Sequence, residues 1–257
     1  QINPAPYTIT TDSASKAYDG NPLTAPGRVD GLVNGEEVSF TVTGSQTVVG
    51  TSANTYTIVF DKTADQNNYM LNGVSVGRLT VDNMSITDPR IVIDTPVDYI
   101  YDGQAHKWEP TVTDGTTKLV ERTDYTFFYD VTSFIDVKTI NVTIQGVGNY
   151  KDQVVLTYRI LPRPIVVTSG SASKTYDGSP LTNNTVSVNA PTFDGAGKPL
   201  TYDLVAGEDL AYDVTGSQTS IGQSGNAFTI DWTKSTAKEN NYSVTKVEGT
   251  LAVTSVP

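Results

Sequence analysis

The stretch that decides the fold is SASKAYDGNPLT at residues 13–24, because nearly the same twelve residues return as SASKTYDGSPLT at 171–182. The repetition continues in the same order along the chain. TGSQT occurs at 43–47 and again at 215–219, and the tripeptide NNY that follows the first copy is also repeated after the second. Self-similarity over such lengths is typical of tandem modules rather than of one large domain.

A looser third version lies between the two copies, opening with YDG at 101–103 and closing with GNY at 148–150. The sequence therefore predicts three modules in tandem. Their predicted bounds are 1–83, 84–162 and 163–257. Only 27 residues separate Lys16 from Thr43, whereas 41 separate Lys174 from Thr215, so the last module carries an insertion of 14 residues.

Composition excludes several classes of function. The net charge is −11, from 28 acidic and 17 basic residues, and it repels nucleic acid and anionic membrane surfaces. Cysteine is absent, which excludes disulfides and thiolate metal sites. Apolar runs are strand-sized, so we expect no membrane insertion by this segment. The first residue is Gln1, with no signal or anchor segment, and we expect an excerpt of a longer polypeptide.

Period-two alternation dominates the hydrophobic pattern and predicts an all-β fold. It occurs at 38–42, 56–60, 140–144, 154–160 and 228–232. The best candidates for a helical turn are only 63–66 and 235–238. Modules of this size with short alternating strands favour small immunoglobulin-like β-sandwiches, with a β-grasp-like sheet as the alternative. The two prolines in Leu161-Pro162-Arg163-Pro164 predict a stiff joint and an elongated arrangement.

The recurring motif residues are predicted to serve the scaffold. In Tyr-Asp-Gly, Asp accepts hydrogen bonds from turn amides, Gly supplies an unusual φ, and Tyr packs beside the next strand. The Asn-Tyr pairs are expected to plug the end of each core. The residues are Lys16, Tyr18, Asp19, Gly20, Asn68, Tyr69, Tyr101, Asp102, Gly103, Asn149, Tyr150, Lys174, Tyr176, Asp177, Gly178, Asn241 and Tyr242.

The sequence also suggests three chemical roles as alternatives to the scaffold role. The aspartates suggest calcium, but their spacing does not resemble an EF-hand loop. Lys16 and Lys174 suggest a Lys–Asn isopeptide crosslink, against the simpler interpretation of strand lysines. The lone His106 lacks a recognisable catalytic pattern around it, so we expect no enzyme activity and no cofactor or metal.

Aromatic residues gather in the middle module. Trp108, Tyr125, Phe127 and Tyr129 are candidate ligand contacts, because an exposed aromatic strip suits sugar stacking or a protein interface. The simpler explanation is contact with neighbouring domains of the same polypeptide.

The motifs of the first and last modules resemble the MBG-type repeat of bacterial surface proteins. The middle module, with YDGQAHK at 101–107, is similar to a related YDG-containing repeat of such proteins. The resemblance implies a non-catalytic stalk of a wall-associated, secreted bacterial adhesin at the cell surface. A module that binds host glycan or protein and an accessory region of a secreted enzyme are the alternatives.

Overall fold

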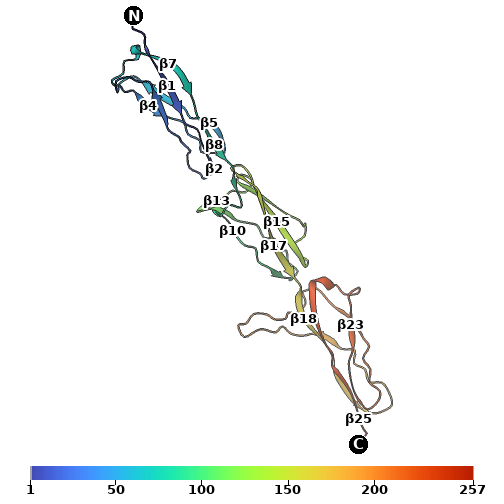
Figure 1. The fold of residues 1–257 in the computed structure, drawn as a ribbon. Coiled ribbons are helices and arrows are strands. Elements are labelled where there is room, and N and C mark those ends of the chain that lie inside the picture. Colours follow the sequence, from blue (N-terminus) through green and yellow to red (C-terminus); the bar gives the residue numbers. More distant parts are fainter. Residues whose placement is uncertain (1, 257) are drawn as a thin grey trace. The chain divides into compact units, whose positions relative to one another are not determined.

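The computed structural model describes residues 2–256, which are built almost entirely of β-strands (Figure 1). Within this range there is no α-helix, only the 3-10 turns η1 (Gln66–Asn68) and η2 (Glu239–Asn241). None of the described helices has the length and apolar character needed to span a membrane. The predicted all-β class is confirmed. The choice between immunoglobulin-like and β-grasp-like modules stays a prediction.

The chain divides into two compact units. Unit 1 comprises residues 1–95, 110–128 and 142–156, and unit 2 comprises 96–109, 129–141 and 157–257. The predicted three-module division is not tested by this result and stays a prediction. For description we use the first segment (2–83), the middle segment (84–162) and the last segment (163–256).

The first segment has two three-stranded sheets, ordered β3-β1-β7 and β2-β8-β5, and an antiparallel pair, β4-β6. Its strands are β1 Ala5–Thr11, β2 Ala14–Ala17, β3 Gly27–Asp30, β4 Ser39–Val42, β5 Gly50–Ala53, β6 Tyr56–Val59, β7 Tyr69–Ser75 and β8 Arg78–Asp82. Alternation buries Tyr7 and Ile9 of β1 against Tyr69 and Ala64. This is one core cluster of the segment, and Phe40, Tyr56 and Phe60 pack around it among other partly buried side chains.

The first and last strands of this segment run parallel over its whole length. β1 pairs with β7, and after a common bend β2 pairs with β8 (Figure 1). At the bend, a Cβ on Gly77 would lie 2.2 Å from the carbonyl oxygen of Asp12, so only glycine fits there. Asn54 is fully buried beside the bend and donates to that same carbonyl at 2.9 Å. The bend thus transfers the strand pair from one sheet to the other.

The last segment repeats this plan, with sheets β20-β18-β24 and β19-β25-β22 and the pair β21-β23. Its strands are β18 Arg163–Ser169, β19 Ala172–Thr175, β20 Val186–Val188, β21 Ala211–Val214, β22 Gly222–Gly225, β23 Phe228–Asp231, β24 Tyr242–Val247 and β25 Thr250–Thr254. Gly249 and the buried Asn226 occupy the places of Gly77 and Asn54, because Asn226 donates to the carbonyl of Gly170 at 2.9 Å.

The middle segment contains sheets ordered β10-β12-β13, β11-β17-β15-β14 and β16-β9. Its strands are β9 Met84–Ser85, β10 Ile91–Ile93, β11 Tyr99–Ile100, β12 Val112–Asp114, β13 Thr117–Lys118, β14 Tyr125–Tyr129, β15 Lys138–Gly146, β16 Tyr150–Lys151 and β17 Gln153–Leu161. Ile140, Val142 and Ile144 of β15 are fully buried on one face, as their alternation predicts.

One local expectation is corrected. The helical turns lie at 66–68 and 239–241, directly before the Asn-Tyr tyrosines, and not at 63–66 and 235–238. The insertion of the last segment forms an excursion between β20 and β21, in which Thr192 and Thr201 bond through backbone and side chain. Arg163 fixes its base by donating to the carbonyl of Asp203 and stacking on the Tyr202 ring.

Candidate functional site

The three Tyr-Asp-Gly turns occupy the same place in their segments, because each directly follows a strand that pairs parallel with the last strand: β2 with β8, β11 with β17 and β19 with β25. In each, the tyrosine N–H donates to the carbonyl that ends the last strand: Tyr18 to Asp82 at 2.8 Å, Tyr101 to Leu161 at 2.9 Å and Tyr176 to Thr254 at 2.9 Å. The three glycines adopt φ values of +77°, +79° and +82°, a region that other residues rarely enter. The turn therefore places each tyrosine ring at one end of its segment.

The three Asn-Tyr pairs lie at the opposite end. Their tyrosines pair in register with the residue that begins the first strand of each segment: Tyr69 with Ala5, Tyr150 with Met84 and Tyr242 with Arg163. All three tyrosines are buried. One end of a segment thus presents a Tyr-Asp-Gly turn, and the other end presents an Asn-Tyr pair.

These two kinds of end meet inside unit 1, where Tyr18, Val49, Asn149 and Tyr150 form what we name the first joint. The Tyr18 ring packs edge-on against Tyr150, with centroids 5.7 Å apart and an interplanar angle of 82°. The Val49 N–H donates to Asn149 Oδ1 at 3.1 Å. Edge-to-face aromatic pairs add about 1 kcal/mol beyond burial, so the recurring tyrosines stabilise the joint directly.

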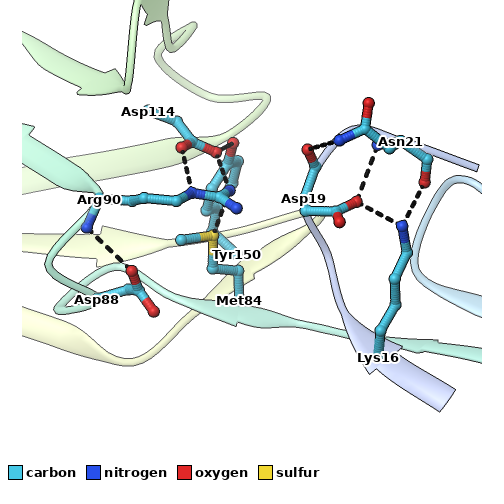
Figure 2. A network of polar contacts seen from close by, with 8 residues as sticks. All are labelled: Lys16, Asp19, Asn21, Met84, Asp88, Arg90, Asp114 and Tyr150. Atoms are coloured by element: carbon cyan, nitrogen blue, oxygen red, sulfur yellow. Dashed lines mark hydrogen bonds and ion pairs between the residues drawn. The ribbon is translucent and has the colours of Figure 1, made fainter.

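A carboxylate completes the first joint, as Figure 2 shows. The Tyr150 hydroxyl donates to Asp114 Oδ2 at 3.1 Å, and Arg90 bonds both oxygens of the same carboxylate at 2.9 and 2.7 Å. Burial, together with the Asp114 charge, raises the pKa of Tyr150 well above its usual value. Arg90 also contacts the sulfur of Met84. The bidentate pair fixes the hydroxyl acceptor in one orientation.

A hydrogen-bonded ion pair stabilises the Tyr-Asp-Gly turn itself, and Figure 2 also shows it. Lys16 Nζ donates to Asp19 Oδ1 at 2.6 Å and to the Asn21 carbonyl at 2.7 Å. The bond from Lys16 to the carboxylate, followed by that from the N–H of Asn21, lowers the pKa of Asp19, and Arg90 adds a smaller attraction. Lys174 and Asp177 repeat the pair at 2.6 Å. The lysine therefore holds its own turn.

The second joint lies inside unit 2 and consists of Tyr101, Val137, Asn241 and Tyr242. The Tyr101 ring packs edge-on against Tyr242, with centroids 5.6 Å apart and an angle of 80°. The Val137 N–H donates to Asn241 Oδ1 at 3.0 Å. Each contact has a counterpart in the first joint, although the two sets of residues share only the Tyr-Asp-Gly and Asn-Tyr motifs.

Glu208 joins the two tyrosines of the second joint. Tyr101 donates to its Oε1 at 2.6 Å, Tyr242 donates to its Oε2, and the Val205 N–H donates to the Tyr242 hydroxyl at 3.0 Å. Burial, with Glu208 as the second cause, raises the pKa of Tyr101 to about 12. Gly103 packs so closely that a Cβ there would lie 2.7 Å from Val205 Cγ1. A larger residue here would have to displace the Val205 side chain, and the positive φ independently favours glycine.

An ion pair borders the second joint. Asn241 Nδ2 donates to Asp136 Oδ1 at 2.9 Å, and Lys238 Nζ bonds Asp136 Oδ2 at 2.8 Å. The bond from Lys238, then that from Asn241, lowers the pKa of Asp136. Asn241 is fully buried and uses both its oxygen and its nitrogen, so it is fixed in one orientation.

The aromatic candidates of the middle segment do not form one exposed platform. Tyr125 is buried and its hydroxyl donates to the Pro110 carbonyl, while Tyr129 donates to the Trp108 carbonyl. Trp108 and Phe127 are half-buried. The exposed ring of β14 is Phe128, on the opposite face. Strand alternation turns Tyr125, Phe127 and Tyr129 to the same face, and Tyr125 shows that this face is interior.

The geometry adds little support for a metal site or for a catalytic role of His106. No cluster of His, Asp and Glu suited to a metal ion occurs among the described residues. His106 stacks on Tyr99 with centroids 4.3 Å apart and lies 2.8 Å from Asp102 Oδ1. Asp102 also accepts from the N–H of Gln104, as a turn aspartate does.

Sequence reasoning missed the polar partners in the joints, namely the side chains of Arg90, Asp114, Asp136 and Glu208 and the backbone N–H groups of Val49 and Val137. One signal was present: Gly-Glu occurs at 35–36 and again at 207–208, at matching places in the two similar segments. Comparison with known proteins adds no identification, because no protein-family model matches the chain and no curated protein matches it significantly.

Proposed function

We propose that this chain is a non-catalytic, load-bearing spacer of an extracellular bacterial surface adhesin, built from MBG-type and related repeats. The supporting observation is the parallel pairing of first and last strands in the first and last segments. When such a segment is pulled from its two ends, the paired strands slide in opposite directions. Their hydrogen bonds then share the load, whereas an antiparallel hairpin pulled at its open end loses them one by one.

The joints support the same proposal. Each combines a tyrosine pair, an asparagine bonded to a backbone N–H, and a carboxylate that orients a hydroxyl. Such contacts restrain bending between consecutive segments, which a spacer requires. The acidic charge discourages non-specific association.

Single-molecule pulling tests this function. Handles at the chain ends should give a high unfolding force for the first segment. The matched control carries handles on Ser39→Cys and Val59→Cys, which are cross-strand partners in the antiparallel pair β4–β6. The absence of native cysteine makes these attachments specific. The control should open at a clearly lower force, and equal forces in the two geometries would contradict the spacer.

A binding module is the second candidate, and the excursion of the last segment favours it. Phe193 and Leu200 are both more than half exposed there. An exposed aromatic and aliphatic pair on a pinned loop suits a host protein or glycan surface. Binding on glycan and matrix-protein arrays should disappear in Phe193→Ser/Leu200→Ser. The middle-segment hypothesis predicts instead that Trp108→Ala abolishes binding, with Phe128→Ala as the exposed control.

A further inference from the structure

The two outer ends of the described chain carry half-joints. Ala5, Met84 and Arg163 hold equivalent positions, because each pairs with the Asn-Tyr tyrosine of its segment. The residues three places earlier are therefore also equivalent: Ile2, Val81 and Ile160. Val81 and Ile160 are each 1% exposed, in the last strands β8 and β17, whereas Ile2 is 99% exposed. Ile2 thus has the position of a core residue but no core around it in the described structure.

The surface beside Ile2 matches the Asn-Tyr side of the second joint. The Tyr69 hydroxyl donates to Glu36 Oε2 at 2.5 Å and accepts from the Val33 N–H at 3.0 Å. Tyr242, Glu208 and Val205 make the same two bonds. In the second joint, the other oxygen of the glutamate accepts from the Tyr-Asp-Gly tyrosine. We name the surface of Val33, Glu36, Asn68 and Tyr69 the tyrosine socket.

The tyrosine socket is hollow and accessible. A surface pocket of about 460 Å³ lies here, and Ile2, Val33, Glu36 and Asn68 are among its lining residues. Asn68 is exposed, whereas its equivalent Asn241 is buried in the second joint, where its oxygen accepts a backbone N–H. The asparagine of the Asn-Tyr pair is thus buried in the second joint and exposed at the socket.

The opposite end carries the complementary half. Tyr176 is 44% exposed, whereas its equivalent Tyr101 is 3% exposed in the second joint. Ile221 is equivalent to Val49, because Gln46 bonds the Val48 carbonyl and Gln218 bonds the Ser220 carbonyl at the same 2.7 Å. Ile221 is 59% exposed. We name the surface of Tyr176, Gly178 and Ile221 the tyrosine plug.

We propose that the plug of one copy of this chain docks into the socket of a second copy, forming a further joint of the same kind. The Tyr176 hydroxyl donates to Glu36, the Ile221 N–H donates to Asn68 Oδ1, and Gly178 lies against Val33, as Gly103 lies against Val205. The second copy would be the partner of the spacer, so the biological role of this docking rests on the proposed function. Its physical basis is the pair of joints already present in the chain.

We expect that the plug fills the socket completely only when the two copies are joined covalently. Both internal joints are held by a chain that passes directly from one segment to the next, and this raises the effective concentration of the two halves. Thr254 is equivalent to Leu161, because each accepts the N–H of its Tyr-Asp-Gly tyrosine. A tandem fusion that joins Thr254 of one copy to Pro4 of the next therefore reproduces the Leu161–Pro162 spacing, and Val253 of the first copy takes the place of Ile2, which the junction removes.

The experiment measures thermal unfolding of this fusion with Tyr176→Ala placed in one copy at a time. In the leading copy, the substitution removes a docked ring and should lower the midpoint of the affected transition by about 2–4 °C. In the trailing copy, the same ring stays at an open end, and the midpoint should stay unchanged. This variant is the matched control, since composition and length are identical.

Glu36→Gln measures the same interface from the other side. It should lower the midpoint more in the trailing copy, whose socket is filled, than in the leading copy. Equal shifts for both placements of both substitutions would overturn the docking proposal. That result would leave the spacer function standing, because the pulling comparison uses a single copy and does not involve these surfaces.

Discussion

The two joints use the same aromatic pair but supply its polar partner differently. In the first joint, Tyr150 donates to Asp114, which Arg90 holds from the same segment. In the second joint, Glu208 accepts from both Tyr101 and Tyr242. The recurring motifs therefore fix where rings and asparagines meet, while the acid that orients the hydroxyl is free to come from another element.

The joints also differ in burial. Tyr101 and Asn241 are almost fully enclosed in the second joint, whereas Tyr18 and Asn149 are half-buried in the first. A hydrogen bond gains strength where water is excluded, and an unpaired group there costs more. We therefore expect the second joint to be the stronger and the more sensitive to substitution.

The largest expected effect comes from removing the enclosed ring. Tyr101→Ala should lower the free energy of unfolding by about 3–4 kcal/mol, as truncation of a buried aromatic usually does. Tyr18→Ala, at the half-buried position, should cost about 1 kcal/mol. Urea denaturation of the two variants measures both costs. Equal losses would break the distinction between the joints.

The next effect tests the shared carboxylate. Glu208→Gln keeps the shape of the side chain but removes the charge that two hydroxyls share, and it should cost about 2 kcal/mol. Glu36→Gln is the matched control in the single chain, because among residues 2–256 its carboxylate accepts from Tyr69 alone, and its cost should be smaller. Denaturation midpoints compare the two. A larger loss for Glu36→Gln would contradict the bridging role of Glu208.

Alkaline pH provides a third, smaller effect. The pKa of Tyr101 is raised to about 12, mainly by burial, whereas an unfolded tyrosine titrates near 10. Its contribution to stability is therefore complete below about pH 10 and is lost as the pH rises from about 10 to 12. Unfolding midpoints across this range should fall less steeply in Tyr101→Phe. If the unfolding midpoint of that variant fell with pH as steeply as that of the unmodified chain, Tyr101 would not have a raised pKa.

The smallest effect is expected at the edge of the second joint. Lys238→Ala removes the exposed partner of Asp136, and such surface pairs contribute little and are screened by salt. Its small destabilisation at low ionic strength should disappear in 1 M NaCl. Asn241→Ala, which removes a buried acceptor, should keep its cost in the same salt. A salt-resistant loss for Lys238→Ala would place this pair among the buried contacts.

Much of the fold was predictable from local patterns. Alternation at 140–144 and 154–160 predicted the strands β15 and β17, because the side-chain period of a half-buried strand is visible in any short window. The bends at Gly77 and Gly249 were not predicted. They depend on two strands distant in sequence approaching closely, which no local pattern records.

The candidate site was predictable only in part. The repeated tyrosines, glycines and asparagines were expected to serve the scaffold, and this stays a prediction, while the structure adds their contacts across the joints. Asp114 and Glu208 could not be assigned to these tyrosines, since a carboxylate becomes a partner only when folding places it beside a hydroxyl. Tyr125 was grouped with the surface candidates because alternation defines a face without saying which face is covered.

The sequence by itself determined that this chain is a series of β-rich repeats with a Tyr-Asp-Gly turn and an Asn-Tyr pair in each, because periodicity and turn chemistry are local properties. Only the tertiary structure decided that the turn of one segment packs against the Asn-Tyr pair of the next. That contact joins residues about a hundred positions apart, such as Val49 with Asn149. Its energy comes from burial and hydrogen-bond geometry, which arise only once the segments are folded.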